Sequence, residues 1–291
     1  MTSRSAVAAS RRAARADRER GQFLFSRWHL ILIPVAAVML IPMVWMLVTS
    51  VETLNETRHF PPDLLPHTVR LRNYADVLQQ APFARWFVNT VIVTVVSVAG
   101  NLLFCSLAGY AFARIKFFGR EIVFLAILAT LMIPFQVVMI PTFIIVKDLG
   151  MINTLGALIV PNLAGAFGIF LLRQFFRTLP VELEEAARID GASRLSVLFK
   201  IILPLSGPAL ATLAVITFLW TWNDFLWPLI TISSANNMTL QLGLTTFQGT
   251  HQTSTNLLMA ANVMSMLPVL LLFFLAQRYF IRGIATSGLK G

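Results

Sequence analysis

Long runs of apolar residues, separated by short polar segments, make up most of the chain. A helix that crosses the hydrocarbon core of a membrane needs roughly 20 apolar residues. Six runs approach or exceed this length, and they cover about residues 29–51, 86–112, 122–146, 155–172, 201–222 and 257–276. None of them alternates apolar and polar residues as the strands of an outer-membrane barrel do. The pattern predicts an all-α integral membrane protein with six transmembrane helices.

The fourth run is the least regular of the six. It contains Pro161 and three glycines, which are Gly156, Gly165 and Gly168. In a helix bundle, neighbouring helices can satisfy the backbone groups that such residues leave free. We therefore still expect a span there.

The first run has the position of a secretory signal peptide but not its dimensions. The apolar part of a signal peptide is usually about 7–15 residues long, whereas this run covers residues 29–51, and no small-x-small cleavage site follows it in residues 49–57. We expect an uncleaved first span. Residues 1–28 are rich in Ala, Ser and Arg and are expected to form a flexible basic arm, with the transmembrane domain covering residues 29–291.

The composition agrees with a membrane protein and excludes other classes. Hydrophobic residues make up 57% of the chain and charged residues 12%, which is about half the usual charged fraction. A soluble enzyme of this length would need more charges to cover its surface, and a disordered chain would be far less apolar. Cys105 is the single cysteine, so a disulfide framework or a cysteine-clustered metal site is excluded. We expect Cys105 to be a small buried core residue.

The net charge of +10 is explained by where the basic residues lie. Eighteen of the 23 precede the first run, follow the last, or lie between runs two and three or four and five. Basic residues concentrate on the cytoplasmic side of membrane proteins, which predicts an N-in, C-in topology with residues 173–200 in the cytoplasm. The charge therefore indicates orientation, and we expect no nucleic-acid partner.

The spans carry almost no ionisable side chains that could drive transport. Secondary carriers and pumps usually have Asp, Glu, His or Arg within their spans, but residues 88–113, 122–146 and 201–223 contain none. The nucleotide-binding pattern G-x-x-x-x-G-K-[ST] is also absent from the sequence. If the protein moves a solute uphill, a partner must supply the energy. We expect no catalytic residue, metal site or cofactor in this chain.

The cytoplasmic loop 173–200 is the candidate surface for such a partner. Pro180 can open a helix, three glutamates (Glu182, Glu184 and Glu185) favour its first turns, and Gly191 suits the position that ends it. Ser193 can cap a second short helix, and Pro204 begins the return to the membrane. The loop is thus expected to form a helix–turn–helix outside the bilayer. The alternative is an amphipathic helix that rests on the lipid headgroups.

The residues of this loop also match a known motif. The pattern is E-A-A-x3-G-x9-I-x-L-P, filled by Glu185, Ala186, Ala187, Gly191, Ile201, Leu203 and Pro204. It resembles the EAA loop of permease subunits in binding-protein-dependent ABC importers and covers about residues 178–204. Residues 222–229 and 277–283 and the pairs Asn73-Tyr74 and Asn89-Thr90 are similar to the maltose-type (MalG-like) carbohydrate permeases. The tail departs from that family, because it reads GIATSGLKG in place of G-L-T-A-G-A-V-K-G.

The resemblance implies a multi-subunit importer in a bacterial cytoplasmic membrane. The chain would pair with a second, homologous permease, with two cytoplasmic ATPase subunits that hold ATP and Mg, and with an extracytoplasmic sugar-binding protein. Glu185 matches the glutamate that pairs with a basic residue of the ATPase, and Glu184 and Asp190 lie in the same loop. The spans would contact membrane lipid. The rivals are an importer of a sugar-related solute such as glycerol phosphate, a self-sufficient secondary carrier, and a membrane-embedded enzyme.

The aromatic segment around residue 222 allows two interpretations. Tryptophans often form a belt at the membrane interface, which is the expected role of Trp227 and fits Trp222. Alternatively, aromatic faces stack on a sugar while polar neighbours bind its hydroxyl groups. The candidate pathway residues are Trp220, Trp222, Asn223, Asp224 and Gln136. The sequence leaves the sugar itself open.

Overall fold

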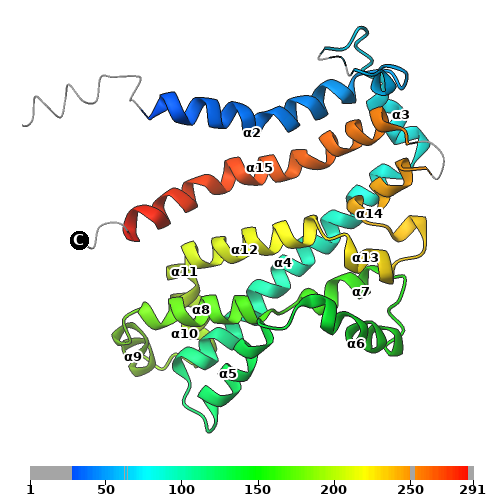
Figure 1. Ribbon diagram of the computed structural model, residues 1–291. Coiled ribbons are helices and arrows are strands. Elements are labelled where there is room, and N and C mark those ends of the chain that lie inside the picture. The colour runs from blue at the N-terminus through cyan, green and yellow to red at the C-terminus, as the bar shows by residue number, and fades with distance from the viewer. Residues whose placement is uncertain (1–27, 62, 64, 250–252, 288–291) are drawn as a thin grey trace, which may run out of the picture.

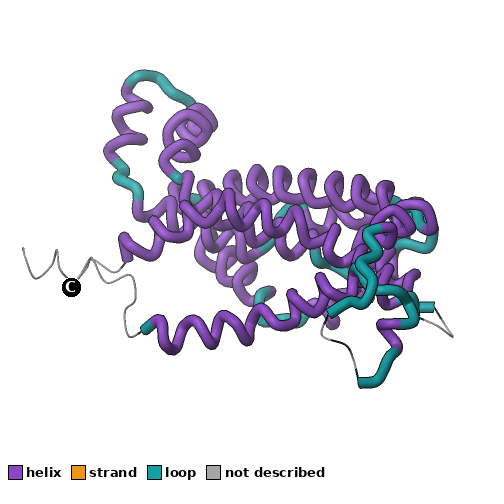
Figure 2. Tube along the Cα trace, turned by 90° about the horizontal axis from the view of Figure 1, so that it is seen from above, coloured by secondary structure: helices purple, strands orange, loops and turns teal. Residues whose placement is uncertain are grey.

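The computed structural model describes residues 28–61, 63, 65–249 and 253–287, with side chains described up to residue 277. Helices form most of this part of the chain, which contains no β-strand (Figure 2). The predicted arm 1–28 lies outside the described residues except for Trp28. The main helices are α2 (His29–Ser50), α3 (Arg72–Gln80), α4 (Phe83–Arg114), α5 (Arg120–Thr130), α6 (Phe135–Asp148), α7 (Leu155–Ile159), α8 (Ala166–Thr178), α9 (Glu182–Ile189), α10 (Arg194–Val197), α11 (Leu203–Leu205), α12 (Gly207–Trp222), α13 (Leu226–Thr231), α14 (Leu240–Leu244) and α15 (Thr255–Ser287).

Short 3-10 and π segments complete the element order. The 3-10 turns are Glu56–Arg58, Val160–Asn162, Ala235–Asn237 and Thr245–Phe247, and a π-helical turn covers Leu198–Ile202. The turn Val160–Asn162 separates α7 from α8. The irregularity expected around Pro161 is therefore present, although the segment from α7 to α8 still counts as one apolar span.

Four segments in the described part of the chain are long and apolar enough to cross a membrane. They are α2, α4, the segment Leu155–Thr178 and the first part of α15, Thr255–Gln277. Two further pairs reach span length only together, because α5 and α6 are bent by 103° and the helices on either side of Ser206 by 83°. The number of candidate spans is therefore four, or six if each bent pair crosses once.

Both bends occur where proline disfavours a continuous helix. Pro134 is the N-cap of α6 and has an extended ψ of 141°, and a proline lacks the N–H that a continuous helix would need at this position. At the second bend, Ser206 has φ −95° and ψ 16°, and Pro208 lies in the first turn of α12. The predicted run 201–222 is therefore not one straight helix, since its first residues belong to the bent segment before α12.

Helix α4 is the central element of the packing, with α8 and α12 as its main neighbours. Glycine allows the close approach of α8, because a Cβ added at Gly109 would lie 3.1 Å from the backbone nitrogen of Arg173. Small residues commonly permit such contacts between membrane helices. Cys105 is fully buried in this interface, as predicted.

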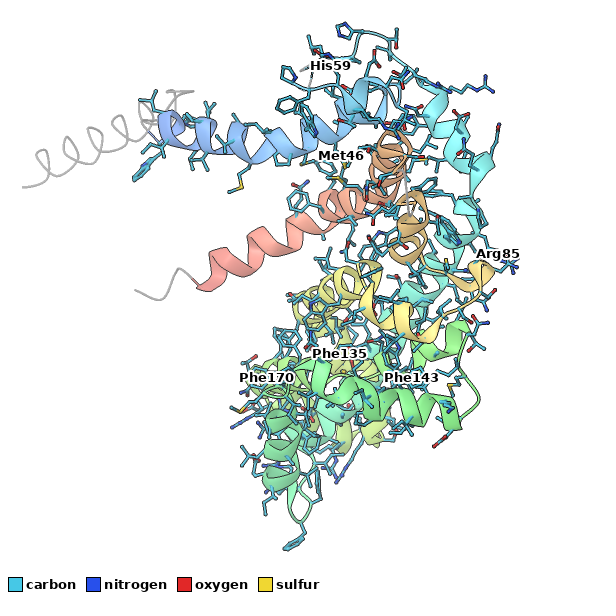
Figure 3. The ribbon with its side chains drawn as sticks, turned by 45° about the vertical axis from the view of Figure 1, so that its right-hand side comes forward. Met46, His59, Arg85, Phe135, Phe143 and Phe170 are labelled. Atoms are coloured by element: carbon cyan, nitrogen blue, oxygen red, sulfur yellow. The ribbon has the colours of Figure 1, made fainter. Side chains whose placement is uncertain are left out.

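The two ends of the molecule carry different elements. The start of α2, the last turns of α15 and the short helix α9 lie at one end, and α3, α7, α13 and α14 lie at the other (Figure 1). At the second end, Arg85 at the start of α4 lies on the edge of the molecule, and His59 lies in the loop after α2 (Figure 3). The loop that contains α9 thus lies at the same end of the molecule as the start of α2 and the end of α15 (Figure 1).

Candidate functional site

The short helix α9 lies in the middle of the loop that the sequence singles out. Three glutamates occupy its first turn, where carboxylates stabilise the positive end of the helix dipole. The helix begins at Glu182 with Val181 at the N-cap, so Pro180 lies two residues before the start rather than at the first helical position.

The end of α9 has the predicted glycine turn. Gly191 has φ +84°, a left-handed conformation that glycine adopts without a steric penalty. The Ala192 N–H donates to the Ala187 carbonyl at 2.9 Å, and the Gly191 N–H donates to the Arg188 carbonyl at 3.1 Å. This is the Schellman arrangement. Ser193 then caps α10 by accepting from the Ser196 N–H at 3.2 Å, which confirms the predicted helix–turn–helix.

The buried face of α9 carries an ion pair to the end of α4. Glu184 is only 7% exposed, and its Oε1 lies 2.7 Å from Arg114 Nε. The contact is an ion pair without hydrogen-bond alignment, and Tyr110 donates to the other carboxylate oxygen at 3.1 Å. Arg114 also donates to the carbonyls of Phe176 and Leu179 at 2.7 and 2.6 Å. One guanidinium therefore joins α4, α9 and the C-terminal end of α8.

A second arginine, Arg173, joins α8 to α4 and to α5. Arg173 of α8 is 4% exposed and donates to the Phe112 carbonyl of α4 at 3.2 Å. It also donates to Glu121 at the start of α5 at 2.8 Å, and its guanidinium lies 3.8 Å above the ring of Phe124. These contacts fix the ends of α4, α5 and α8 relative to one another.

The opposite face of α9 is open. Glu185, Ala186, Asp190 and Gly191 are exposed, whereas Ala187 is half-buried and packs against the core below. The other motif residues lie further along: Ile201 and Leu203 pack against the same core, and Pro204 is exposed. The motif is therefore divided between residues that anchor the loop and residues that face outward.

Arg114 and Tyr110 belong to this site, although the sequence does not predict them there. In the sequence, Arg114 is only one of the basic residues that indicate orientation. Its partner Glu184 is 70 residues away in the chain, and helical spacing cannot predict a pair between two separate elements. The only local indication of a buried partner was the group of three glutamates in one helical turn, of which one faces inward.

The aromatic segment packs into the protein. Trp227 is 2% exposed and donates to the Ala157 carbonyl at 2.9 Å. Trp222 is also 2% exposed and donates to the Ser265 carbonyl at 3.1 Å. The interpretation of both residues as part of an interfacial belt is therefore wrong, because buried tryptophans with bonded indole groups hold helices together.

The remaining candidate pathway residues lie nearer the surface. Trp220 is 63% exposed and packs edge-on against Phe167 with ring centres 5.7 Å apart. Asn223 is exposed, and its Oδ1 lies 3.5 Å from Gln241 Nε2. Asp224 is half-buried, and its Oδ1 accepts from the backbone N–H of Trp227 at 3.3 Å. Gln136 is exposed in the first turn of α6. Trp220 and Asn223 thus present polar and aromatic groups outward, whereas Trp222 does not.

The described residues contain no cluster of three or more His, Cys, Asp or Glu side chains that could hold a metal ion. The polar groups near α9 are instead arranged as ion pairs between helices. These ion pairs connect α9 to α4 and α8 to α5.

Comparison with known proteins agrees with this geometry. Residues 102–286 match the family described as "Binding-protein-dependent transport system inner membrane component". The arabinooligosaccharides transport system permease protein AraQ of Halalkalibacterium halodurans is 41% identical over 78% of this chain and 81% of its own. The sn-glycerol-3-phosphate transport system permease protein UgpE of Pectobacterium atrosepticum is 36% identical over 93% of this chain and 99% of its own.

A solved structure gives the same result for the fold. A chain from a bacterial ABC transporter involved in the import of the acidic polysaccharide alginate superimposes with a TM-score of 0.75 and 27% identity, covering 88% of this chain and 99% of that one. The superposition therefore extends over most of this chain and nearly all of the other. The chain is a multi-pass membrane protein, and it belongs to the family of inner membrane permease components of binding-protein-dependent ABC importers.

Proposed function

We propose that this chain forms half of the translocation pathway of an ATP-driven sugar importer and that α9 receives the movement of a partner ATPase. The observation that carries the proposal is the two-sided character of α9. Glu184 is buried against Arg114, while Glu185 and Ala186 on the same helix are exposed. Because packed elements move as units in switching transitions, a partner bound to the exposed face can displace α4 and α8 through the buried one.

The proposal places this end of the molecule in the cytoplasm of a bacterial cell, with six spans in the cytoplasmic membrane. The basic residues that flank the spans support this orientation. ATP and Mg belong to the partner ATPase subunits, and a second, homologous permease completes the pathway. An extracytoplasmic binding protein delivers the solute. Residues 29–291 form the transmembrane domain, and residues 178–204 form the coupling loop.

The proposed substrate is a carbohydrate. Relatives are named for arabinooligosaccharides, and a structural neighbour is described as importing alginate. The second candidate is a glycerol phosphate, because the relative named for it covers nearly the whole chain. Trp220, with its exposed ring, and Asn223 are the residues on which we place the substrate pathway, together with Asp224 and Gln136. A binding assay on the cognate binding protein decides between the two classes.

The test of the coupling role is Glu185→Lys, with Glu182→Lys as a matched control. Both glutamates are exposed on α9, so both variants should insert into the membrane normally. A lysine at 185 would face the basic residue of the ATPase, and like charges brought together at an interface oppose binding. We expect co-purification of the ATPase and solute-stimulated ATP hydrolysis to fall at least tenfold in Glu185→Lys and to change little in the control.

Two results would contradict the proposal. One is undiminished solute-stimulated ATP hydrolysis in the Glu185→Lys complex, which would remove α9 from the docking surface. The other is a tagged chain that purifies without an ATPase or a second permease and still transports in vesicles without ATP. That result would favour a self-sufficient carrier.

A further inference from the structure

A basic cavity lies beside the coupling loop. It has a volume of about 510 Å³ and is bounded by the end of α4, the loop before α5, and the helices α9 and α10. Five basic side chains line it against two carboxylates. The basic residues are Arg114, Lys116, Arg120, Arg188 and Arg194.

Part of this positive charge is already neutralised within the chain. Arg114 pairs with Glu184, and Arg120 pairs with Glu121 at 2.8 Å. The ion pairs of the described residues do not include Lys116, Arg188 or Arg194, and all three are exposed. The lining also holds one carboxylate outside these ion pairs, Glu185, so an anion that enters the cavity meets three cations against a single negative charge.

Next to this cavity lies a second one of different character. Its volume is about 410 Å³, it shares Lys116 and Arg120 with the first, and its lining includes Phe117 and Ile122. Ile122 in the first turn of α5 is 74% exposed, and Phe118 in the loop before α5 is fully exposed. A loop that displays such large apolar side chains beside cations suits a ligand that has both a negative head and an apolar tail.

The position of the two cavities along the chain also favours a lipid ligand. The two cavities lie where the 32-residue helix α4 ends and α5 begins. In the proposed topology this is the boundary between membrane and cytoplasm. Basic pockets between membrane helices on the cytoplasmic side are places where anionic lipid headgroups bind.

We propose that this pair of cavities binds the headgroup of an anionic phospholipid, with its phosphate among Lys116, Arg188 and Arg194 and its acyl chains over Phe117 and Ile122. An acidic segment of a partner protein would match the charge but would leave the apolar side chains uncovered. The lipid would then contact α4, α5 and α9 at once and hold the coupling loop against the membrane. The proposal rests on the proposed function only for the placement of this end at a membrane boundary.

The test is native mass spectrometry of the full-length chain in detergent, titrated with phosphatidylglycerol or with the zwitterionic phosphatidylcholine. The variant Lys116→Gln/Arg194→Gln removes two cations that line the cavity and that form no ion pair with another described residue. The matched control Arg177→Gln/Lys200→Gln removes two exposed cations from the same end that do not line it. Each basic residue near a membrane surface contributes about fivefold to the affinity for anionic lipid. We expect about 25-fold weaker binding of phosphatidylglycerol by the cavity variant, parent-like binding by the control, and no such difference for phosphatidylcholine.

Three outcomes would overturn the proposal. The cavity variant could bind phosphatidylglycerol as the parent does. Soluble glycerol phosphate could displace the lipid at equal concentration, which would make the occupant a free phosphate. The bound lipid could disappear when the ATPase is present, which would make the cavity part of a protein interface. Lipid binding by the chain alone does not require the ATPase. A failure of the lipid proposal can therefore be distinguished from a failure of the proposed coupling role, which the Glu185→Lys variant tests.

Discussion

The contact between Arg114 and Glu184 can be tested by a double-mutant cycle. The single variants are Arg114→Met and Glu184→Gln, and the third is their combination. Both side chains are nearly buried, with 12% and 9% of their surface exposed. The ion pair therefore lies where screening by solvent is weak and where an unpaired charge is costly.

The structure predicts unequal costs for the two single changes. Arg114→Met removes the cation that pairs with the Glu184 carboxylate, which keeps its hydrogen bond from Tyr110, and it removes the donor to two carbonyls at the end of α8. Removing one partner of a buried pair typically costs about 3–5 kcal/mol. Glu184→Gln keeps a side chain of the same shape, and Arg114 keeps both carbonyl acceptors, so the expected cost is about 1–2 kcal/mol. The double variant should lose about 2 kcal/mol less unfolding free energy than the sum of the two single variants, since it no longer leaves an unpaired carboxylate.

The assay is reversible unfolding in mixed micelles, followed by tryptophan fluorescence. Additivity within about 0.5 kcal/mol would refute the reasoning, because independent sites behave in that way. A second readout separates a positioning role from simple stability. Under conditions where all variants stay folded, we expect Arg114→Met to lower the amount of solute imported per ATP hydrolysed, and Arg177→Met, an exposed arginine of α8, to leave that ratio unchanged.

Three further substitutions test other parts of the structure. Gly191→Val places a β-branched residue at φ +84°, which should lower the free energy of unfolding by roughly 1–2 kcal/mol and reduce the solute imported per ATP hydrolysed. Gly191→Asn should be tolerated. Equal uptake by the two variants would contradict the role of the left-handed turn at residue 191. A Cβ at Gly243 would overlap the Trp86 ring, so Gly243→Ala should lower the free energy of unfolding by roughly 1–3 kcal/mol. Gly207→Ala should not, because the space around Gly207 is open. Burial raises the pKa of Asp224 above its usual 3.8, so the folded state loses stability as the pH rises past that value. Asp224→Asn should therefore be more stable than the parent at pH 7, with the gain vanishing below pH 3.8; an equal gain at both pH values would show that the carboxylate is not its cause.

The sequence predicted best those features that depend on local composition. Apolar runs of span length, the glycine that ends α9 and the serine that caps α10 each follow from neighbouring residues, and the structure contains all three. Bends were harder to predict, because a proline near a span is compatible with either a straight or a broken helix in a bundle. The 103° turn between α5 and α6 could therefore not be read from Pro134 alone.

Features that depend on contacts between distant segments could not be predicted in this way. Trp227 satisfies its indole N–H at Ala157, 70 residues earlier, and nothing in the local pattern separates this role from that of an interfacial tryptophan. Glu184 and Glu185 are adjacent in sequence and identical in type, yet one is buried and the other exposed. Only the packing of α9 against α4 assigns them different roles.

The contacts of α4 explain how movement at one end of the molecule can reach the other. At its C-terminal end, Arg114 is held by α8 and α9. At its opposite end, Trp86 donates to the Ala235 carbonyl, Asn89 donates to two carbonyls of the 236–238 segment, and Thr90 accepts from the Leu240 N–H. A continuous helix of 32 residues that is hydrogen-bonded at both ends is stiff along its axis. The bends beside Pro134 and Ser206 interrupt their spans, so we infer that relative movement is taken up there, while α4 moves as a unit with α9.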